Sequence, residues 1–146
     1  MSIEEGKQKS TDQFILRMNE AVKNEDHDEM LDIIYDICEL PEDDIAVDAL
    51  NHLLIIKGHF RHENILKSIQ DYAHPSSVKY IEVALNQGFE HIDYYNGSGF
   101  APISQWFSYA LASINTKEAV DLLKKYARHE NDEISGHMRR LLEQIT

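Results

Sequence analysis

An internal repeat constrains the fold of this chain more than any other feature of its sequence. Residues 27–50 align without a gap on residues 62–85, and a less regular third copy follows near the C-terminus. Repetition with a period in the thirties is typical of helical solenoids, in which each unit buries its apolar face against its neighbours. We therefore expect an all-α fold, an α-solenoid of about eight antiparallel helices in four pairs. The matching apolar positions are Leu31, Leu66 and Val120 in one set and Ile34, Ile69 and Leu123 in the other.

The length of the chain predicts one domain. A chain of 146 residues can bury roughly 70% of its unfolded surface without disulfides or metals. Ser10 and Gln13 form a possible capping box, so we expect the domain to span residues 10–146 and residues 1–9 to be a disordered tail. Those first residues lack the apolar stretch of a signal peptide, and no apolar run approaches the length of a membrane span. These patterns favour a cytoplasmic protein that does not enter a membrane.

The net negative charge of the chain comes almost entirely from its first third. Residues 1–50 contain 15 acidic and 4 basic side chains, whereas residues 51–146 contain 11 and 10. A nucleic-acid binder needs the opposite sign to neutralise phosphates, so DNA and RNA are not expected ligands. A basic protein partner is compatible with this balance.

Five aspartates form what we call the acidic ridge. Three of them recur at every fourth residue of a predicted helix, a spacing at which like charges repel one another. Two interpretations stay open: the ridge is a merely solvated face, or it is kept acidic for a partner. The acidic ridge consists of Asp28, Asp32, Asp36, Asp44 and Asp48.

Residues 87–102 interrupt the repeat, and we expect a long loop there. Glycine, asparagine and proline residues punctuate the segment. Between them lies the run Asp93, Tyr94 and Tyr95. These side chains either fill a groove between repeat units or form a recognition loop, since tyrosine is common at binding hot spots.

No motif in the sequence predicts catalysis, a cofactor, a metal or a small-molecule substrate. His52, His59 and His62 are spread over a helix and a loop without the spacing of a zinc site. The stretch around Gly97 and Gly99 is too short for a nucleophile turn and lacks the lysine of a phosphate-binding loop. The single cysteine, Cys38, occupies a repeat position filled elsewhere by alanine, so we expect a buried packing residue rather than a reactive thiol.

The sequence also resembles known families over residues 53–142. Residues 106–123 are similar to a HEAT repeat, in which an Ala-Leu helix and a short Asn-Thr turn precede Glu-Ala-Val and a leucine pair. The segments 62–65, 89–95 and 110–119 resemble small bacterial HEAT-like proteins of polymorphic-toxin and contact-dependent inhibition systems, where such proteins confer immunity.

The resemblance implies a HEAT-like immunity protein that binds the toxic C-terminal domain of a cognate effector, in many such systems a nuclease, and occludes its active site or substrate surface. An acidic partner would be steered onto a basic toxin electrostatically. The expected contacts are the acidic ridge together with Asp93, Tyr94 and Tyr95. Two rivals stay open: a HEAT-like scaffold or adaptor with a non-toxin partner, and a helical-repeat enzyme.

Overall fold

The chain is all-helical throughout the part that the structure describes. A computed structural model describes residues 2–97 and 99–146, and the side chains of Ile3, Tyr94, Tyr95 and Asn96 lie outside that description. No strand occurs in these ranges, which confirms the predicted all-α class. Along the chain the helices are α1 (Ile3–Lys23), α2 (His27–Cys38), α3 (Asp43–Leu54), α4 (His62–Tyr72), α5 (Ser77–Asn86), α6 (Phe89–Asn96), α7 (Phe100–Ile114), α8 (Lys117–Ala127) and α9 (Asp132–Ile145).

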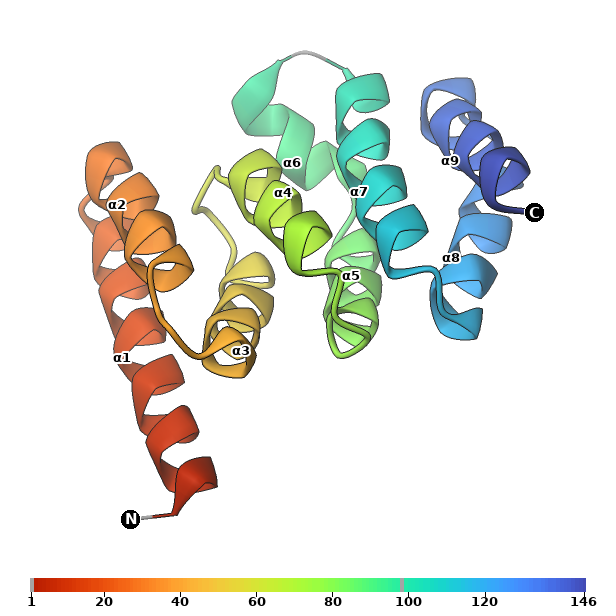
Figure 1. Ribbon diagram of the computed structural model, residues 1–146. Helices are drawn as coiled ribbons and strands as arrows, with labels where there is room; N and C mark the ends of the chain where they lie inside the picture. The colour runs from red at the N-terminus through yellow and green to blue at the C-terminus, as the bar shows by residue number, and fades with distance from the viewer. Residues whose placement is uncertain (1, 98) are drawn as a thin grey trace.

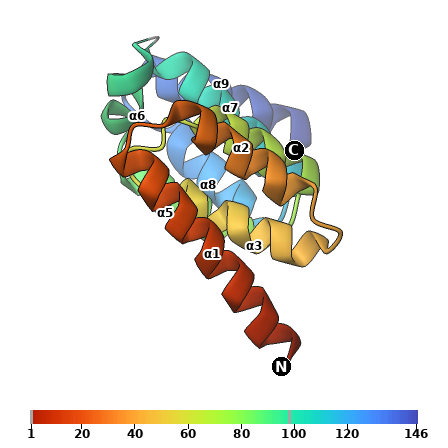
Figure 2. The same ribbon diagram turned by 90° about the vertical axis from the view of Figure 1, so that its left-hand side faces the viewer.

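Two rows of helices make up the molecule (Figure 1 and Figure 2). In one row α2, α4, α7 and α9 pack in succession, and in the other α1, α3, α5 and α8 do so. Large apolar side chains fill the space between the rows, among them Leu50, Leu66, Ile81 and Phe107, which are fully buried. The repeat positions predicted to be core are confirmed for Leu66, Ile69 and Leu123, and the neighbouring Ala127 is partly buried.

Short polar side chains fix where several helices begin. The Asp26 carboxylate accepts a hydrogen bond from the Glu29 amide at 3.1 Å, and Thr116 Oγ1 accepts one from Ala119 at 3.2 Å. Each of these contacts satisfies a backbone donor that has no partner within the helix. The caps set the starts of α2 at His27 and of α8 at Lys117.

The first helix begins earlier than the sequence predicts. We expected a disordered tail over residues 1–9 and a helix cap at Ser10, but α1 starts at Ile3. Ser2 Oγ accepts a hydrogen bond from the Glu5 amide at 3.1 Å, and Glu4 and Glu5 occupy the first turn, where the helix dipole favours negative charge. Ser2 therefore takes the capping role that was assigned to Ser10.

The segment predicted as a long loop contains a further helix. α6 spans Phe89–Asn96, so the expectation of eight helices and of a loop over residues 87–102 is wrong. Phe89 and Ile92 are buried, and the Phe89 ring lies 6.0 Å from that of Phe107. The glycines that suggested a loop instead begin and end the helix, because Gly88 and Gly97 adopt the positive φ angles 99° and 64°.

Cys38 does not have the predicted buried position. Its side chain is exposed at the last residue of α2, with Sγ 3.5 Å from Ser68 Oγ. The alanines at the equivalent repeat positions are only partly buried, so this position lies at the edge of the core rather than inside it. The repeat alignment therefore matched Cys38 to the equivalent helix positions, but the prediction that its side chain is buried is wrong.

Candidate functional site

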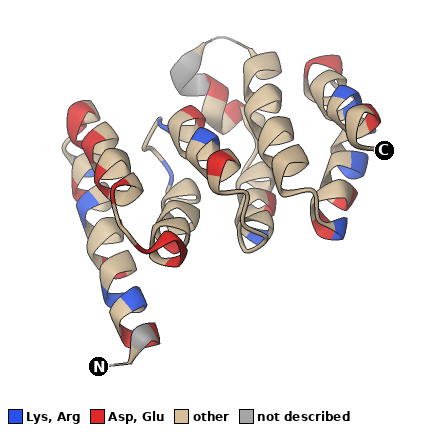
Figure 3. Ribbon diagram, viewed as in Figure 1, with Lys and Arg blue, Asp and Glu red and all other residues tan. Residues whose placement is uncertain are grey.

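The α2 part of the acidic ridge is exposed to solvent. Asp28, Asp32 and Asp36 all project from α2 with exposed side chains, and Figure 3 shows acidic residues gathered on α2 and at the start of α3. Asp36 is engaged, because Arg17 Nη1 of α1 lies 3.0 Å from its carboxylate. Asp28 and Asp32 form no ion pair among the described residues. The open negative charge on α2 is therefore concentrated at these two aspartates.

The α3 part of the ridge divides in the same way. Asp44 is exposed in the first turn of α3, where the helix dipole favours it. Asp48, with a side chain only 20% exposed, accepts a hydrogen bond from Thr11 Oγ1 of α1. Thr11 is fully buried, so this contact joins α1 to α3. Of the five ridge residues, Asp36 and Asp48 contact other helices, and the other three are exposed and form no ion pair in the described part of the chain.

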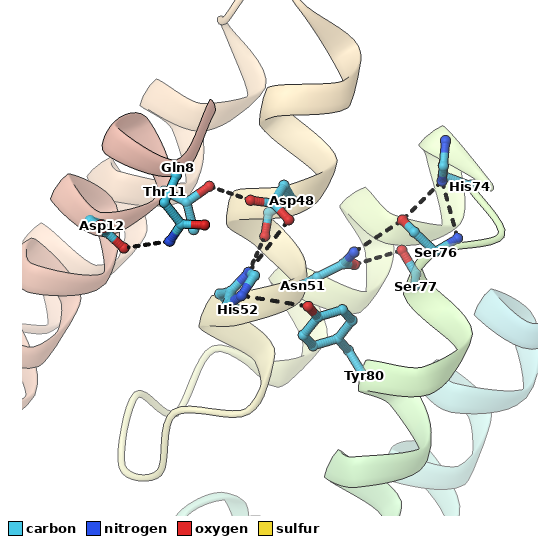
Figure 4. A network of polar contacts seen from close by, with 10 residues as sticks. All are labelled: Gln8, Thr11, Asp12, Asp48, Asn51, His52, His74, Ser76, Ser77 and Tyr80. Atoms are coloured by element: carbon cyan, nitrogen blue, oxygen red, sulfur yellow. Dashed lines mark hydrogen bonds and ion pairs between the residues drawn. The ribbon is translucent and has the colours of Figure 1, made fainter. Parts of the chain in front are cut away.

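Asp48 belongs to a polar network that links α1, α3 and α5 (Figure 4). Asn51 of α3 is buried, donates to Ser76 Oγ at 3.2 Å and accepts from Ser77 Oγ at 2.6 Å. His52 Nδ1 lies 2.8 Å from the Asp48 backbone oxygen but 3.7 Å from the Asp48 carboxylate. His52 therefore donates its Nδ1–H to a backbone oxygen, whereas in a catalytic triad the imidazole donates this hydrogen to a carboxylate. The network thus acts as a fixed junction between helices.

Of the three contact residues predicted in the interruption, the structure describes the side chain of Asp93. Asp93 Oδ1 accepts a hydrogen bond from the Gly99 amide at 2.8 Å, so this carboxylate fixes the turn between α6 and α7. The side chains of Tyr94 and Tyr95 lie outside the described residues. α6 packs on α7, whereas α2 packs on α1, α3 and α4. The two predicted contact regions therefore lie on different parts of the helix array.

Sequence reasoning missed one exposed aromatic side chain on α2. Tyr35 is 55% exposed and follows Asp28 and Asp32 at helical spacing, with Glu39 one turn further on. We call this exposed set the α2 stripe: Asp28, Asp32, Tyr35 and Glu39. The signal was present in the sequence, because Tyr35 falls opposite the buried Ile33 and Ile37 on a helical projection.

A groove between α4 and α7 was also missed. It has a volume of about 360 Å³, and α7 contributes Trp106, which is half-buried, and Tyr109, which is 37% exposed. The buried face of α7 is that of Phe107 and Leu111, so Trp106 and Tyr109 lie beside the core rather than inside it. The lining residues are Glu63, Lys67, Gln70, Gln105, Trp106 and Tyr109.

Two buried histidines lie where the chain passes from α3 to α4. The rings of His59 and His62 are 4.2 Å apart, and both side chains are buried. His59 Nδ1 accepts a hydrogen bond from the Arg61 amide at 2.9 Å, while Nε2 lies 3.3 Å from the Leu54 carbonyl oxygen and donates to it. Burial lowers the pKa of His59 to about 4 and that of His62 to about 2. Both imidazoles are therefore neutral at pH 7.

The histidines considered as metal ligands are not brought to one place. His52 lies on α3 with its ring 5.0 Å from that of Tyr80, apart from the pair His59 and His62. Across residues 2–97 and 99–146, no three His, Cys, Asp or Glu side chains are grouped in a way that could hold a metal ion. Within the same ranges no helix has both the length and the apolar character needed to span a membrane.

Comparison with known proteins gives this chain no relative. No family model matches it, and neither a curated protein nor a solved structure does so.

Proposed function

We propose that this chain is an immunity protein that binds the toxic C-terminal domain of a cognate bacterial effector in the cytoplasm. The resemblance of residues 62–65, 89–95 and 110–119 to HEAT-like immunity proteins supports this assignment. The finer description of the fold, a HEAT-like solenoid of paired helices, belongs to the same proposal. It is supported by the two rows in which successive helices pack (Figure 1).

The observation that carries the proposal is the α2 stripe. It sets one well-exposed aromatic, Tyr35, among the carboxylates of Asp28, Asp32 and Glu39, on a helix whose other face is buried. Tyrosine is enriched among the residues that dominate binding energy, and surrounding charges guide the approach of a partner of opposite sign. A rigid helix that presents both is suited to a basic protein surface.

The mechanism is occlusion. A toxin that cleaves nucleic acid needs a basic cleft for its substrate, and an acidic protein seated over that cleft excludes the substrate without any chemistry of its own. Asp28, Asp32 and Asp44 supply the free charge for such a contact. Asp36 and Asp48 support it indirectly, because their internal contacts hold α2 and α3 against α1.

Co-expression tests this function directly. The C-terminal domain of the effector encoded beside this chain is expressed in bacterial cells with and without the chain, and growth is followed. We expect growth arrest without the chain, normal growth with it, and a complex of the two proteins on size-exclusion chromatography. A domain that arrests growth equally in both strains and forms no complex would contradict the proposal.

A further inference from the structure

We propose that the groove between α4 and α7 is a receptor for an arginine side chain of the partner. The inference rests on the proposed function, since it names the chemistry with which that partner is held. Its residues are separate from those of the α2 stripe, because the groove combines aromatic, acidic and amide groups of α4 and α7 in one hollow.

The aromatic side chains of the groove provide a surface on which a cation can stack. Trp106 and Tyr109 stand three residues apart on α7, which places them on the same face of the helix. Tryptophan and tyrosine attract cations to their ring faces, and a guanidinium, being planar, also stacks on them. An aromatic pair at the side of a polar groove therefore favours arginine over an apolar side chain.

The opposite wall, formed by α4, supplies the negative charge, and both walls supply hydrogen-bond acceptors. Glu63 is an exposed residue of the first turn of α4, and its carboxylate forms no ion pair among the described residues. The side-chain amides of Gln70 and Gln105 line the same groove and can accept hydrogen bonds from guanidinium N–H groups. A carboxylate can bind arginine through two parallel hydrogen bonds, which an ammonium group cannot match.

Charge complementarity decides which kind of partner segment the groove would take. The protein has a net charge of −12, and the acidic helix α2 packs beside α4 in the same row. The one cation at the groove, Lys67, is exposed and forms no ion pair in the described part of the chain. The positive charge of Lys67 opposes a basic occupant and would assist an acidic one. Removal of this charge should therefore strengthen the binding of a basic peptide and weaken that of an acidic one.

Trp106 makes the test possible without knowing the partner, because it is the single tryptophan of the chain. The full chain is titrated with a short, end-blocked oligo-arginine peptide while Trp106 fluorescence is recorded, and oligo-lysine and oligo-glutamate peptides of equal length are compared. We expect a saturable change with oligo-arginine, binding about three- to tenfold weaker with oligo-lysine, and none with oligo-glutamate. Equal binding of the arginine and lysine peptides, or preferential binding of the glutamate peptide, overturns the proposal.

Charge variants separate a specific contact from general attraction to an acidic protein. Glu63→Gln should weaken oligo-arginine binding by about three- to tenfold, and Lys67→Gln should strengthen it. Glu20→Gln is the matched control, because it removes the same charge from an exposed position on α1, a helix at the edge of the array that does not line the groove (Figure 1). Equal effects of Glu63→Gln and Glu20→Gln would show unspecific attraction and overturn the inference.

The outcome is distinguishable from that of the proposed function. If the chain protects cells from the toxic domain but Trp106 does not respond to oligo-arginine, the groove is not an arginine receptor and the immunity function stands. If Trp106 responds as expected but no protection occurs, the groove binds arginine and the assignment as an immunity protein fails.

Discussion

The two ends of the molecule share one apolar core but differ in the contacts that surround it. At the N-terminal end, α1 is joined to α2 and α3 by side-chain polar contacts, such as the Arg17 ion pairs and the bond from Thr11 to Asp48. At the other end, α6, α7 and α8 meet through aromatic packing of Phe89 against Phe107 and Tyr126. The comparison shows that the acidic end uses some of its carboxylates for its own assembly. Only the remaining carboxylates are available to a partner.

The largest expected effect lies at the aromatic end. Phe107→Ala should lower the free energy of unfolding by about 3–5 kcal/mol, because the ring is fully buried and its removal leaves a cavity. Chemical denaturation measures this change. Tyr109→Ala, on the exposed face of the same helix, is the control and should cost much less. Similar losses for the two variants would mean that the buried face of α7 is misassigned.

The connection from α3 to α4, where His59 and His62 are buried, should make the stability of the protein depend on pH. The folded-state pKa values of His59 and His62, about 4 and about 2, lie below the ordinary value of 6.5. Between pH 6.5 and 4 the unfolded chain therefore binds more protons than the folded chain, so stability is complete above pH 6.5 and falls as the pH is lowered through this window. Each imidazole contributes a slope of up to about 1.4 kcal/mol per pH unit.

His62→Phe isolates the contribution of one histidine to this pH dependence while keeping an aromatic ring at the start of α4. Urea denaturation of the variant and the parent at about pH 7.5 and about pH 5 should show a shallower loss of stability in the variant. Carboxylates also titrate as the pH falls, and comparing the two proteins removes their common effect. Identical slopes would contradict the assignment of a buried neutral imidazole to His62.

A smaller effect is expected from the polar network of the N-terminal half. Asn51→Ala removes the amide that bonds Ser76 and Ser77 and leaves the buried hydroxyl of Ser77 without its acceptor. We expect a loss of about 1–3 kcal/mol in the free energy of unfolding. The double variant Asn51→Ala/Ser77→Ala should recover part of it, since no buried hydroxyl then lacks a partner. A double variant less stable by the full sum of both single losses would contradict this coupling.

The smallest stability effect should come from Arg17, whose two ion pairs are open to solvent. Arg17→Gln should cost about 0.2–1 kcal/mol, and added salt should reduce the difference, because exposed pairs are weak and screened. The same change frees Asp36 and should speed association with a basic partner. Thermal melts at low and high salt check the first expectation. A salt-independent loss would show that Arg17 acts through packing.

Much of the fold was predictable because its signals are local. The repeat placed Leu66, Ile69 and Leu123 in the core, because the apolar spacing of each helix is set by residues close in sequence. The helix α6 was missed because its glycines read as loop residues. The burial of Phe89 and Ile92 that stabilises this helix depends on distant elements.

The candidate site was less predictable, since it depends on which side chains meet across helices. Nothing in the spacing of the acidic ridge tells that Asp36 binds Arg17 of α1 or that Asp48 accepts from Thr11. The groove likewise needs α4 and α7 side by side, although they are separated by two other helices in the chain. Such long-range pairing is absent from a single sequence.

Association kinetics with the toxic domain test the central claim most directly, namely that the free carboxylates of α2 guide the partner. Asp28→Asn/Asp32→Asn should slow association by about three- to tenfold at low salt and flatten its salt dependence, while stability holds or rises. Glu118→Gln/Glu143→Gln, which removes two exposed charges from α8 and α9, is the matched control and should associate like the parent. Association rates for the α2 variant equal to those of the control at every salt concentration would contradict the account.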